Sequence, residues 1–217
     1  MRLKHVPGAE ETVEKSRFVI GDEKARRGHW REVFGKEAAG KDLYAELGCG
    51  KGQFLMRLAE DHPDRLFLGV EMYSSVLLRA VEKQEEKDLP NLRFLRMDAT
   101  YLTEVFAPGE LSGIYCNFSD PWPKDRHAKR RLTSRTFLSR YEQVLAPGAQ
   151  VAFKTDNAGL FAFSLAEAEA AGWEVLSVTE DLYACPDLLA ENVATEYEEK
   201  FAAAGVPICR LLMRPKA

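Results

Sequence analysis

Five apolar segments of the sequence are each followed by residues that could bind a ligand. These residues are Glu46, Gly48 and Gly50 after the first segment, Glu71 after the second, Asp98 after the third, Asp120 after the fourth and Asp156 after the fifth. Any one of these carboxylates could simply cap a helix. A succession of five predicts a shared binding site, because ligands of open parallel sheets bind beyond the carboxyl ends of the strands.

The glycine turn after the first segment distinguishes between nucleotide ligands. Dinucleotide-binding folds use the spacing G-x-G-x-x-G, whereas residues 48–52 read G-x-G-x-G with Glu46 just upstream. That carboxylate would repel a pyrophosphate and attract a cationic amino acid group. Glu71 is placed for the hydroxyls of a ribose, and Asp98 is placed for the amino group of adenine. Together these features predict S-adenosylmethionine as the cofactor, in preference to NAD or ATP.

Several other chemistries are excluded because their motifs are missing. The sequence has no G-x-x-x-x-G-K-[ST], Y-x-x-x-K, H-E-x-x-H or G-x-S-x-G pattern. It therefore does not match a P-loop NTPase, a short-chain dehydrogenase, a zinc hydrolase or a nucleophile-elbow hydrolase. We expect neither a metal site nor a disulfide framework, because the cysteines are far apart in the sequence. They are Cys49, Cys116, Cys185 and Cys209.

A stiff and strongly basic segment follows the fourth apolar run. Residues 117–131 read NFSDPWPKDRHAKRR, in which five Lys or Arg stand against one Asp from position 124 onward. The prolines remove N–H donors and stiffen the backbone, so we expect the loop carbonyls to be free to face a ligand and Trp122 to stack on a base. Amino-group methylases use [ND]-P-P-aromatic, so D-P-W-P suggests an acceptor that is not an exocyclic amine. Because the whole chain has a formal net charge of -4, this local cluster predicts an RNA partner.

Alternating strand and helix patterns would position these residues. Apolar periodicity predicts strands at 41–47, 65–71, 91–98, 113–118, 149–155, 173–181 and 207–215, and helices at 53–62, 73–87, 131–146 and 160–172. This alternation predicts βαβ units in a doubly wound α/β sheet. We expect a catalytic domain at residues 41–217 after a basic N-terminal extension at residues 1–40, in which Trp30 and Phe34 pack a short helix onto the body.

The order of the motifs resembles that in bacterial tRNA (guanine-N7-)-methyltransferases. The motifs ELGCGKG, GVE, MDA, NFSDPWPK-x-RH-x-KRRL, FKTDN and TEYEEKF lie in this order within residues 28–214. Cys49 is a minor departure, since many relatives carry Thr or Ser there. The resemblance implies a Rossmann-like class I methyltransferase fold, with a seven-stranded, mostly parallel sheet whose last strand is antiparallel. It also implies methyl transfer from S-adenosylmethionine to N7 of the guanine at position 46, in the variable loop of tRNA, which forms 7-methylguanosine.

The same resemblance implies roles for individual residues. The residues implied to border the cofactor are Glu46, Gly48, Gly50, Glu71, Asp98 and Asp120, of which Asp120 is also the catalytic residue. Those implied to contact the substrate are Lys124, Asp156, Thr195, Glu196, Tyr197 and Glu198. Those implied to contact RNA are Arg126, His127, Lys129, Arg130 and Arg131.

The chemistry of guanine N7 suits this set of residues. N7 carries a free lone pair, so no general base has to remove a proton before it attacks. Catalysis then depends on in-line alignment and on electrostatics. Asp120 could orient guanine through its N1–H and N2–H groups or stabilise the N7-methylated cation, and the sequence leaves both open. We expect the base to be pulled out of the folded tRNA to reach the site.

Several of these features also have a plainer interpretation. The run from Lys129 to Arg131 could be the solvated start of a helix. Residues 195–198 could belong to an exposed helix with a Glu196–Lys200 ion pair. Four further cations could extend the RNA-binding surface or be ordinary surface charges: Lys24, Arg26, Arg27 and Arg31.

Two rival functions are left open by the sequence. One is a methyltransferase of the same fold that acts on a small molecule or a protein, and the other is an RNA-binding chaperone that retains only the cofactor-binding shell. The first ten residues, MRLKHVPGAE, lack an apolar signal core, and no apolar run is long enough to cross a membrane. We therefore expect a cytoplasmic protein with tRNA as its partner, without a membrane or a metal, as a monomer or a homodimer.

Overall fold

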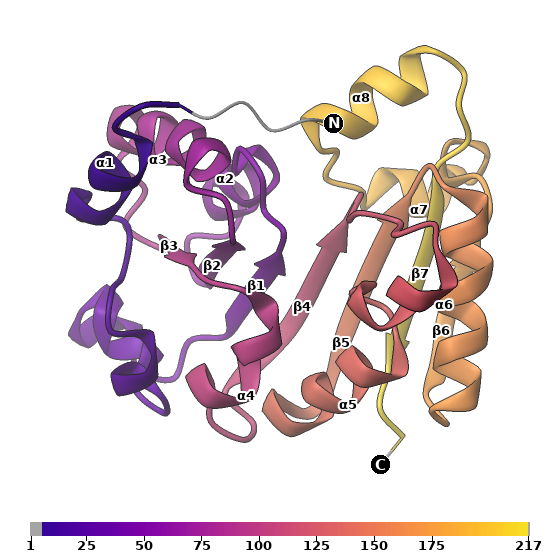
Figure 1. Cartoon of the computed structure of the whole chain (residues 1–217), viewed down its shortest axis with the longest axis horizontal. Coiled ribbons are helices and arrows are strands. Elements are labelled where there is room, and N and C mark those ends of the chain that lie inside the picture. The colour runs from indigo at the N-terminus through magenta and orange to yellow at the C-terminus, as the bar shows by residue number, and fades with distance from the viewer. Residues whose placement is uncertain (1–5, 217) are drawn as a thin grey trace.

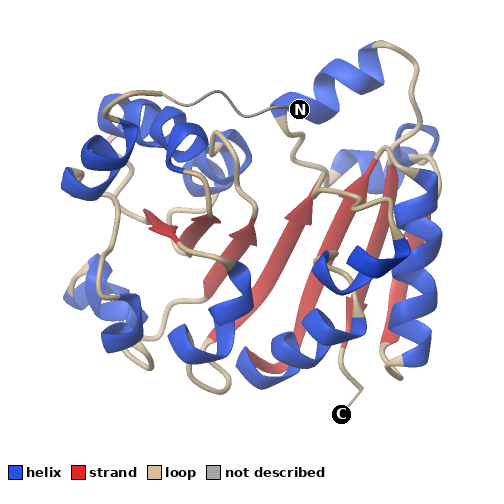
Figure 2. Cartoon of the chain, viewed as in Figure 1, coloured by secondary structure: helices blue, strands red, loops and turns tan. Residues whose placement is uncertain are grey.

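The computed structural model describes residues 6–216 of the 217-residue chain. The first five residues of the predicted basic extension therefore lie outside the described part. Figure 2 shows the strands gathered in one twisted layer, with helices packed on both of its faces. This arrangement follows from the alternation of strands and helices along the sequence.

The sheet has seven strands in the order β3-β2-β1-β4-β5-β7-β6. The strands are β1 (Leu43–Leu47), β2 (Leu66–Glu71), β3 (Leu92–Arg96), β4 (Leu111–Asn117), β5 (Leu145–Thr155), β6 (Glu174–Thr179) and β7 (Cys209–Arg214). Strand β7 is antiparallel to both of its neighbours, β5 and β6, whereas β1 pairs in parallel with β2 and β4. The predicted fold, with a mostly parallel sheet and an antiparallel last strand, is confirmed.

The direction of winding reverses between β1 and β4, which creates the crevice where ligands of such sheets bind. The arrowheads of β1 and β4 point toward the top of Figure 1, where α2 and α8 also lie. The α-helices are α1 (Ala9–Lys15), α2 (Gln53–Asp61), α3 (Ser74–Lys87), α4 (Leu102–Val105), α5 (Arg135–Val144), α6 (Ala158–Ala170), α7 (Pro186–Ala190) and α8 (Glu196–Ala203). The 3-10 helices are η1 (Glu23–Arg26), η2 (Trp30–Phe34), η3 (Lys36–Ala38), η4 (Ala99–Tyr101), η5 (Asp125–Arg130) and η6 (Leu182–Ala184).

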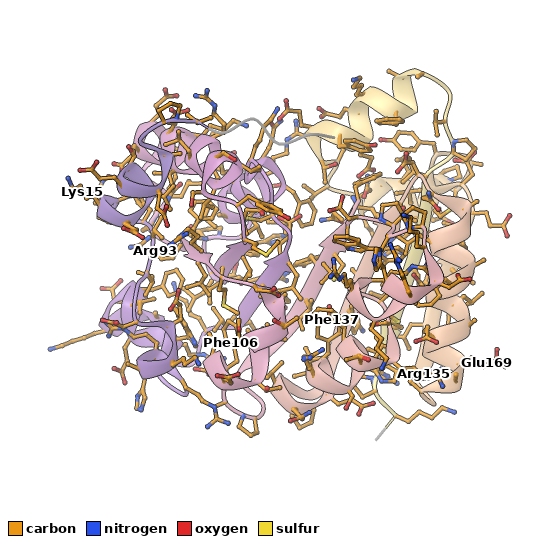
Figure 3. The ribbon with its side chains drawn as sticks, in the orientation of Figure 1. Lys15, Arg93, Phe106, Arg135, Phe137 and Glu169 are labelled. Carbon is orange, nitrogen blue, oxygen red and sulfur yellow. The ribbon has the colours of Figure 1, made fainter. Side chains whose placement is uncertain are left out.

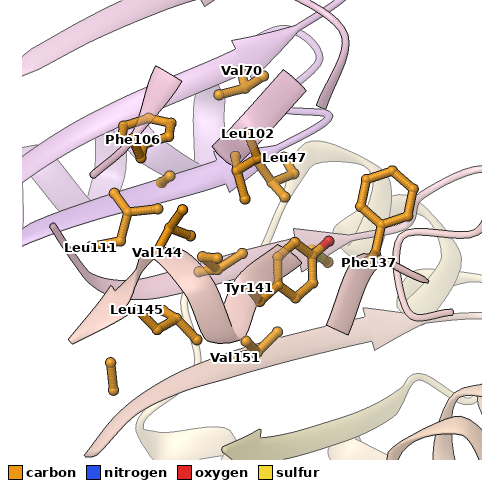
Figure 4. Packing of buried hydrophobic residues seen from close by; sticks show 14 of the residues in the cluster. Leu47, Val70, Leu102, Phe106, Leu111, Phe137, Tyr141, Val144, Leu145 and Val151 are labelled. Atoms are coloured by element: carbon orange, nitrogen blue, oxygen red, sulfur yellow. The ribbon is translucent and has the colours of Figure 1, made fainter. Parts of the chain in front are cut away.

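Two apolar clusters cover the two faces of the sheet. The larger cluster joins the strands to α4, α5 and α6, and Figure 4 shows Leu47 and Val70 packed with Tyr141 in it. The smaller cluster joins the strands to α1, α2 and α3, and Tyr44 packs against it. Because side chains alternate along a strand, Glu46 lies on the same face as Tyr44. The strand period thus places this carboxylate on the α2 side of the sheet.

The N-terminal segment packs against the body of the protein. Phe18 and Trp30 are buried, and Val19 forms a parallel bridge with Phe94 of the edge strand β3. The Trp30 Nε1–H donates to the Val105 carbonyl over 2.8 Å, and its ring lies 5.4 Å from that of Phe106, which Figure 3 labels. The segment therefore extends the sheet edge and covers part of one core.

Two element boundaries differ most from the sequence prediction, each by four residues. The helix predicted from residue 131 begins at Arg135, because residues 125–130 form η5 instead and Ser134 N–H bonds to the Arg131 carbonyl in a turn. Strand β5 begins at Leu145 rather than at 149, because Leu145 already pairs with Leu111 before a shift in register.

Candidate active site

The glycine turn after β1 is open on the side where a ligand would approach. Gly48 and Gly50 have φ values of 75° and 58°, in the left-handed region that glycine tolerates best. A Cβ atom at either position would meet nothing within 4 Å. Gly52 differs, because a Cβ there would lie 2.9 Å from the Ala80 Cβ atom. The turn therefore combines close packing against α3 with free space at Gly48 and Gly50.

Glu46 presents a buried carboxylate with one unused oxygen at this turn. The residue is 2% exposed, and its Oε1 accepts a hydrogen bond of 2.8 Å from the Asn117 Nδ2. Its Oε2 is buried and has no hydrogen-bond partner among the described residues. Burial raises the pKa of Glu46 to about 8, against the opposing influence of the Asn117 hydrogen bond and the Lys154 charge. An orphaned carboxylate oxygen of this kind fits a ligand that carries a positive charge and N–H donors.

Glu71 lies beside the same turn at the end of β2. Its carboxylate accepts from the Gly50 N–H over 3.2 Å and from the Tyr73 N–H over 3.0 Å. Burial raises the pKa of Glu71, the backbone N–H groups oppose this, and the negative charge of Asp120 adds to it. The charge of Glu71 in turn raises the pKa of Glu46. The structure therefore brings Glu46 and Glu71 together at the glycine turn, with Asp120 close enough for its charge to act on Glu71.

Asp98 follows β3, which is separated from β1 by β2. Its Oδ1 accepts from the Thr100 N–H over 2.8 Å, so the residue caps η4. The helix-capping interpretation of this residue is thus realised in the structure. One carboxylate oxygen takes up this hydrogen bond, and the side chain is half-buried.

Asp120 lies in a strained loop that follows β4. Phe118 and Trp122 have φ values of 50° and 42°, which are uncommon for residues other than glycine and recur at functional sites. The Phe118 N–H donates to the Lys154 carbonyl over 2.8 Å, which fixes the start of the loop. Asp120 itself is exposed, and its carboxylate makes no hydrogen bond within residues 6–216. It is free to contact a ligand.

Arg131 holds in place the loop between β4 and η5, residues 118–124, which is called the acceptor loop below. Its guanidinium group donates to the Pro121 carbonyl over 2.9 Å and to the Trp122 carbonyl over 3.0 Å, and it lies 4.2 Å from the centroid of the Phe163 ring. The expectation that the loop carbonyls are free to face a ligand is therefore wrong for these two residues. Of the predicted RNA-contacting residues, Arg131 is the one with the clearest structural contacts.

The other cations of this segment are more accessible. Lys124, Arg126, Lys129 and Arg130 are exposed. The Arg130 guanidinium lies 4.9 Å from the Trp122 ring centroid, and the half-buried His127 ring meets the Trp122 ring edge-on at 5.7 Å. The indole that was expected to stack on a base is thus already in contact with two side chains of its own segment.

The Thr195–Glu198 stretch forms the start of α8. Thr195 and Glu198 make a reciprocal capping box and are both buried. Glu196 pairs with Lys51 at 3.0 Å and with Lys83 at 3.8 Å. The predicted ion pair between Glu196 and Lys200 is therefore wrong. These contacts hold α8 above the glycine turn and the α3 helix.

Tyr197 is 46% exposed and lies between two other aromatic rings. Its ring centroid is 5.0 Å from that of Phe118 in the acceptor loop and 4.3 Å from that of Phe201, onto which it stacks. Burial raises the pKa of Tyr197, and the charge of the half-buried Asp156 adds to this rise. Tyr197 and Asp156 therefore lie near each other.

Two residues in the site were not predicted individually from the sequence. Asn117 holds one oxygen of Glu46, and Lys154 is 5% exposed and pairs in strand register with Asn117. Lys154 belongs to the FKTDN motif, but a motif does not show which face of the sheet a side chain occupies. The alternation of β4 and β5 would have placed both side chains on the Glu46 face once the strand pairing was known.

The N-terminal cations lie apart from this site. Lys24 pairs with Glu104, Arg27 donates to the Thr103 carbonyl, and Arg31 donates to the Lys41 carbonyl. Figure 1 shows η1 and η2 in the dark violet part of the chain at the lower left, away from α8. These contacts favour the interpretation that Lys24, Arg27 and Arg31 hold the segment onto the body.

Within residues 6–216, no group of three His, Cys, Asp or Glu side chains is arranged to hold a metal ion. Over the same range, no helix has both the length and the apolar character needed to span a membrane.

Comparison with known proteins identifies the family. A family described as "Putative methyltransferase" matches residues 41–211. The tRNA (guanine-N(7)-)-methyltransferase of Lachnoclostridium phytofermentans is 50% identical over 212 residues, which cover 98% of this chain and 97% of the relative. The chain belongs to the tRNA (guanine-N7-)-methyltransferase family. A second member, from Brevibacillus brevis, is 46% identical over 97% of each chain.

Solved structures support the fold of this family member at greater evolutionary distance. An antibiotic-related methyltransferase superposes with a TM-score of 0.59 at 16% identity, covering 97% of this chain and 96% of the other. The 16S rRNA methyltransferase KamB superposes with the same TM-score of 0.59 at 16% identity, covering 79% of this chain and 86% of the other. At such identities the likeness establishes the class I methyltransferase fold.

Proposed function

We propose that this family member transfers the methyl group of S-adenosylmethionine to N7 of the guanine at position 46, in the variable loop of tRNA. The observation that carries the proposal is the unpartnered, buried Oε2 of Glu46 beside the open glycine turn. The charge of Asp120 acts on the neighbouring Glu71, and a cationic segment follows Asp120 in the chain. The relatives that match this chain over nearly its whole length are named tRNA (guanine-N(7)-)-methyltransferases, which supports guanine N7 of tRNA as the acceptor. We place the activity in the cytoplasm.

The cofactor-binding half of the site would be formed by the ends of β1, β2 and β3. Glu46 would accept hydrogen bonds from the cationic amino group of the cofactor, and the turn at Gly48 and Gly50 would let its backbone approach closely. Glu71 would accept from the ribose hydroxyls, and the unused oxygen of Asp98 would face the adenine amino group. The methyl group comes from the positively charged sulfur of S-adenosylmethionine.

The substrate-binding half would be formed by the acceptor loop, Asp156 and α8. The free carboxylate of Asp120 would accept from guanine N1–H and N2–H or balance the positive charge that the base gains on methylation at N7. Lys124, Asp156 and the Thr195–Glu198 stretch would surround the base, with the exposed ring of Tyr197 beside it. Because N7 already has a lone pair, no residue has to remove a proton from the base. These residues need to align the base with the methyl group and to stabilise the charge that develops on it.

The tRNA backbone would be bound by the exposed cations of η5 and its flanks. Arg126, Lys129 and Arg130 are exposed on one short segment that includes His127, and Arg131 holds the loop from which they project. Lys and Arg contacts to phosphate release counterions, so the affinity should fall steeply with salt. We also propose that residues 41–217 form the methyltransferase domain and that residues 1–40 are an N-terminal extension of it.

The proposal is tested by methylating tRNA that lacks 7-methylguanosine with isotopically labelled S-adenosylmethionine. Nucleoside mass spectrometry should find the label in 7-methylguanosine, and a tRNA with adenine at position 46 should take up none. Label at another position of tRNA, or only in small molecules or proteins, would support the rival methyltransferase function. Binding of tRNA that produces no methylated product at all and is unaffected by Asp120→Ala would support the chaperone.

A further inference from the structure

We propose that Lys154 is a positioning residue, whose side chain anchors residues 192–198 and thereby places Tyr197 against the acceptor loop. Lys154 lies near the end of β5 and is 5% exposed. Its ammonium group donates to the Asn192 Oδ1 over 2.9 Å, to the Val193 carbonyl over 2.9 Å and to the Glu198 Oε2 over 2.5 Å. All three N–H donors of the ammonium group are used by this one segment.

Glu198 completes the anchor from the other side. Its side chain is 0% exposed, and besides Lys154 it accepts from the Asn192 Nδ2 over 2.6 Å and from the Thr195 N–H over 3.3 Å. A carboxylate that is buried and bonded in this way has little capacity left for a nucleobase. Glu198 therefore contributes to substrate binding by holding the segment that carries Thr195, Glu196 and Tyr197.

The backbone of Lys154 fixes the acceptor loop at the same time. Its carbonyl accepts from the Phe118 N–H over 2.8 Å, two residues before Asp120. The Phe118 ring then meets the Tyr197 ring at 5.0 Å. One residue of the sheet thus holds both segments that would surround the base, which sets the spacing between Asp120 and Tyr197. That these two segments surround a substrate base rests on the proposed function, whereas the anchoring of the segments by Lys154 does not.

Lys154 also lies in a row of polar side chains with the cofactor-binding carboxylate. It pairs in register with Asn117, which donates to Glu46. The charge of Lys154 favours the ionised form of Glu46 and so opposes the rise in its pKa. Loss of the Lys154 charge should therefore weaken cofactor binding as well, whereas a change at Glu198 should not.

The experiment compares three single variants by kinetics and by amide hydrogen exchange. Glu198→Gln weakens the anchor but keeps the Lys154 charge, so KM for tRNA should rise about tenfold while the Kd for S-adenosylmethionine stays unchanged. Lys154→Met should raise both constants. Lys200→Met makes the same substitution at an exposed position of α8 and should change neither. Exchange of the amides of residues 192–203 should increase in the first two variants alone.

A double variant separates positioning from stability. Lys154→Met with Glu198→Met removes the unpaired buried charge, so thermal stability should recover toward the wild-type value, while the bonds to Asn192 and Val193 stay lost and KM for tRNA stays high. Recovery of KM along with stability, or wild-type exchange of residues 192–203 in both single variants, would overturn the proposal. If the wild-type protein methylates no tRNA, the proposed function fails, and the exchange measurements still decide the anchoring.

Discussion

The two halves of the proposed site, the cofactor half and the substrate half, are built from different kinds of structure. The cofactor half stands at strand ends and is buried, with Glu46 2% and Glu71 9% exposed. The substrate half includes α8, a strained loop and the short 3-10 helix η5, and in the loop and η5 Asp120 and most of the cations are exposed. A small ligand of constant shape suits the first arrangement, and a large polyanion suits the second.

The comparison also separates stability from function. In the cofactor half, the fold keeps the Glu46 carboxylate in surroundings that favour its neutral form, since its pKa is raised to about 8. In the substrate half, the charges of Asp120 and of η5 are solvated and contribute little to stability. A substitution of a buried carboxylate in the first half should therefore change stability and cofactor affinity together, whereas one of an exposed charge in the second should change catalysis or RNA binding alone.

The largest expected effect is that of Asp120→Asn. It keeps the shape of the side chain but removes the charge next to the base, so kcat/KM for tRNA should fall about 10³-fold. The Kd for S-adenosylmethionine, measured by calorimetry, should stay within about threefold of the wild-type value, because Glu46 and Glu71 are unchanged. Asp125→Asn, at an exposed position in the same segment, is the control and should leave both values unchanged. A loss of cofactor affinity as large as the loss of activity would assign Asp120 to the cofactor half.

The next largest effect should come from Glu46→Gln, which should raise the Kd for S-adenosylmethionine about 100-fold. The cofactor-free variant should nevertheless be more stable than the wild type. The raised pKa means that the folded state holds the proton more tightly, so wild-type stability falls as pH rises from about 4.5 to about 8. The variant should therefore melt about 5 °C higher at pH 8.5 and show no difference at pH 4.

Glu86→Gln serves as the matched control for this substitution, because Glu86 is exposed on α3. It should change neither the melting temperature nor the cofactor affinity. A Glu46→Gln variant that melts at or below the wild-type temperature at pH 8.5 would show that burial does not disfavour the ionised form of Glu46.

A smaller effect should appear in the pH dependence of cofactor binding. Because the pKa of Glu46 is about 8 in the free protein, the ionised fraction rises about tenfold per pH unit below that value. The affinity for S-adenosylmethionine should thus rise about tenfold between pH 6 and pH 7 in isothermal titrations. A flat profile in the wild type, or an unchanged slope in Glu46→Gln, would contradict the assignment.

The smallest effect should be that of Lys129→Ala combined with Arg130→Ala. The slope of log K against log salt for tRNA should become less steep by about two, with the Kd for S-adenosylmethionine unchanged. Lys36→Ala with Lys216→Ala removes the same charge at exposed positions elsewhere and should leave the slope unchanged. A slope unaffected by the first pair would remove η5 from the RNA interface.

Arg131→Ala sharpens the same comparison. This side chain bonds to two loop carbonyls, so its loss should lower kcat more than it changes the salt slope. The three consecutive cations of the KRR run therefore divide into two that can meet RNA and one that shapes the loop. The sequence does not distinguish them, because the difference lies in what each side chain touches.

The fold was largely predictable from the sequence, since the hydrophobic period of each segment is a local property and the alternation of strands and helices limits the topology. The acids at the strand ends were predictable for the same reason. Boundaries were less so: residues 131–134 have helical composition, but the contacts of Arg131 with the acceptor loop hold them in a turn.

The sequence by itself determined the sheet, the order of the motifs and the edge at which the acids stand. The tertiary structure alone decided that Glu198 is buried against Lys154, that Arg130 covers Trp122, and that Glu196 pairs with Lys51. The physical reason is that burial and partner choice depend on side chains brought together from distant parts of the chain. Spacing along a sequence specifies a period and a face, and only the packing of the elements specifies which neighbour is met there.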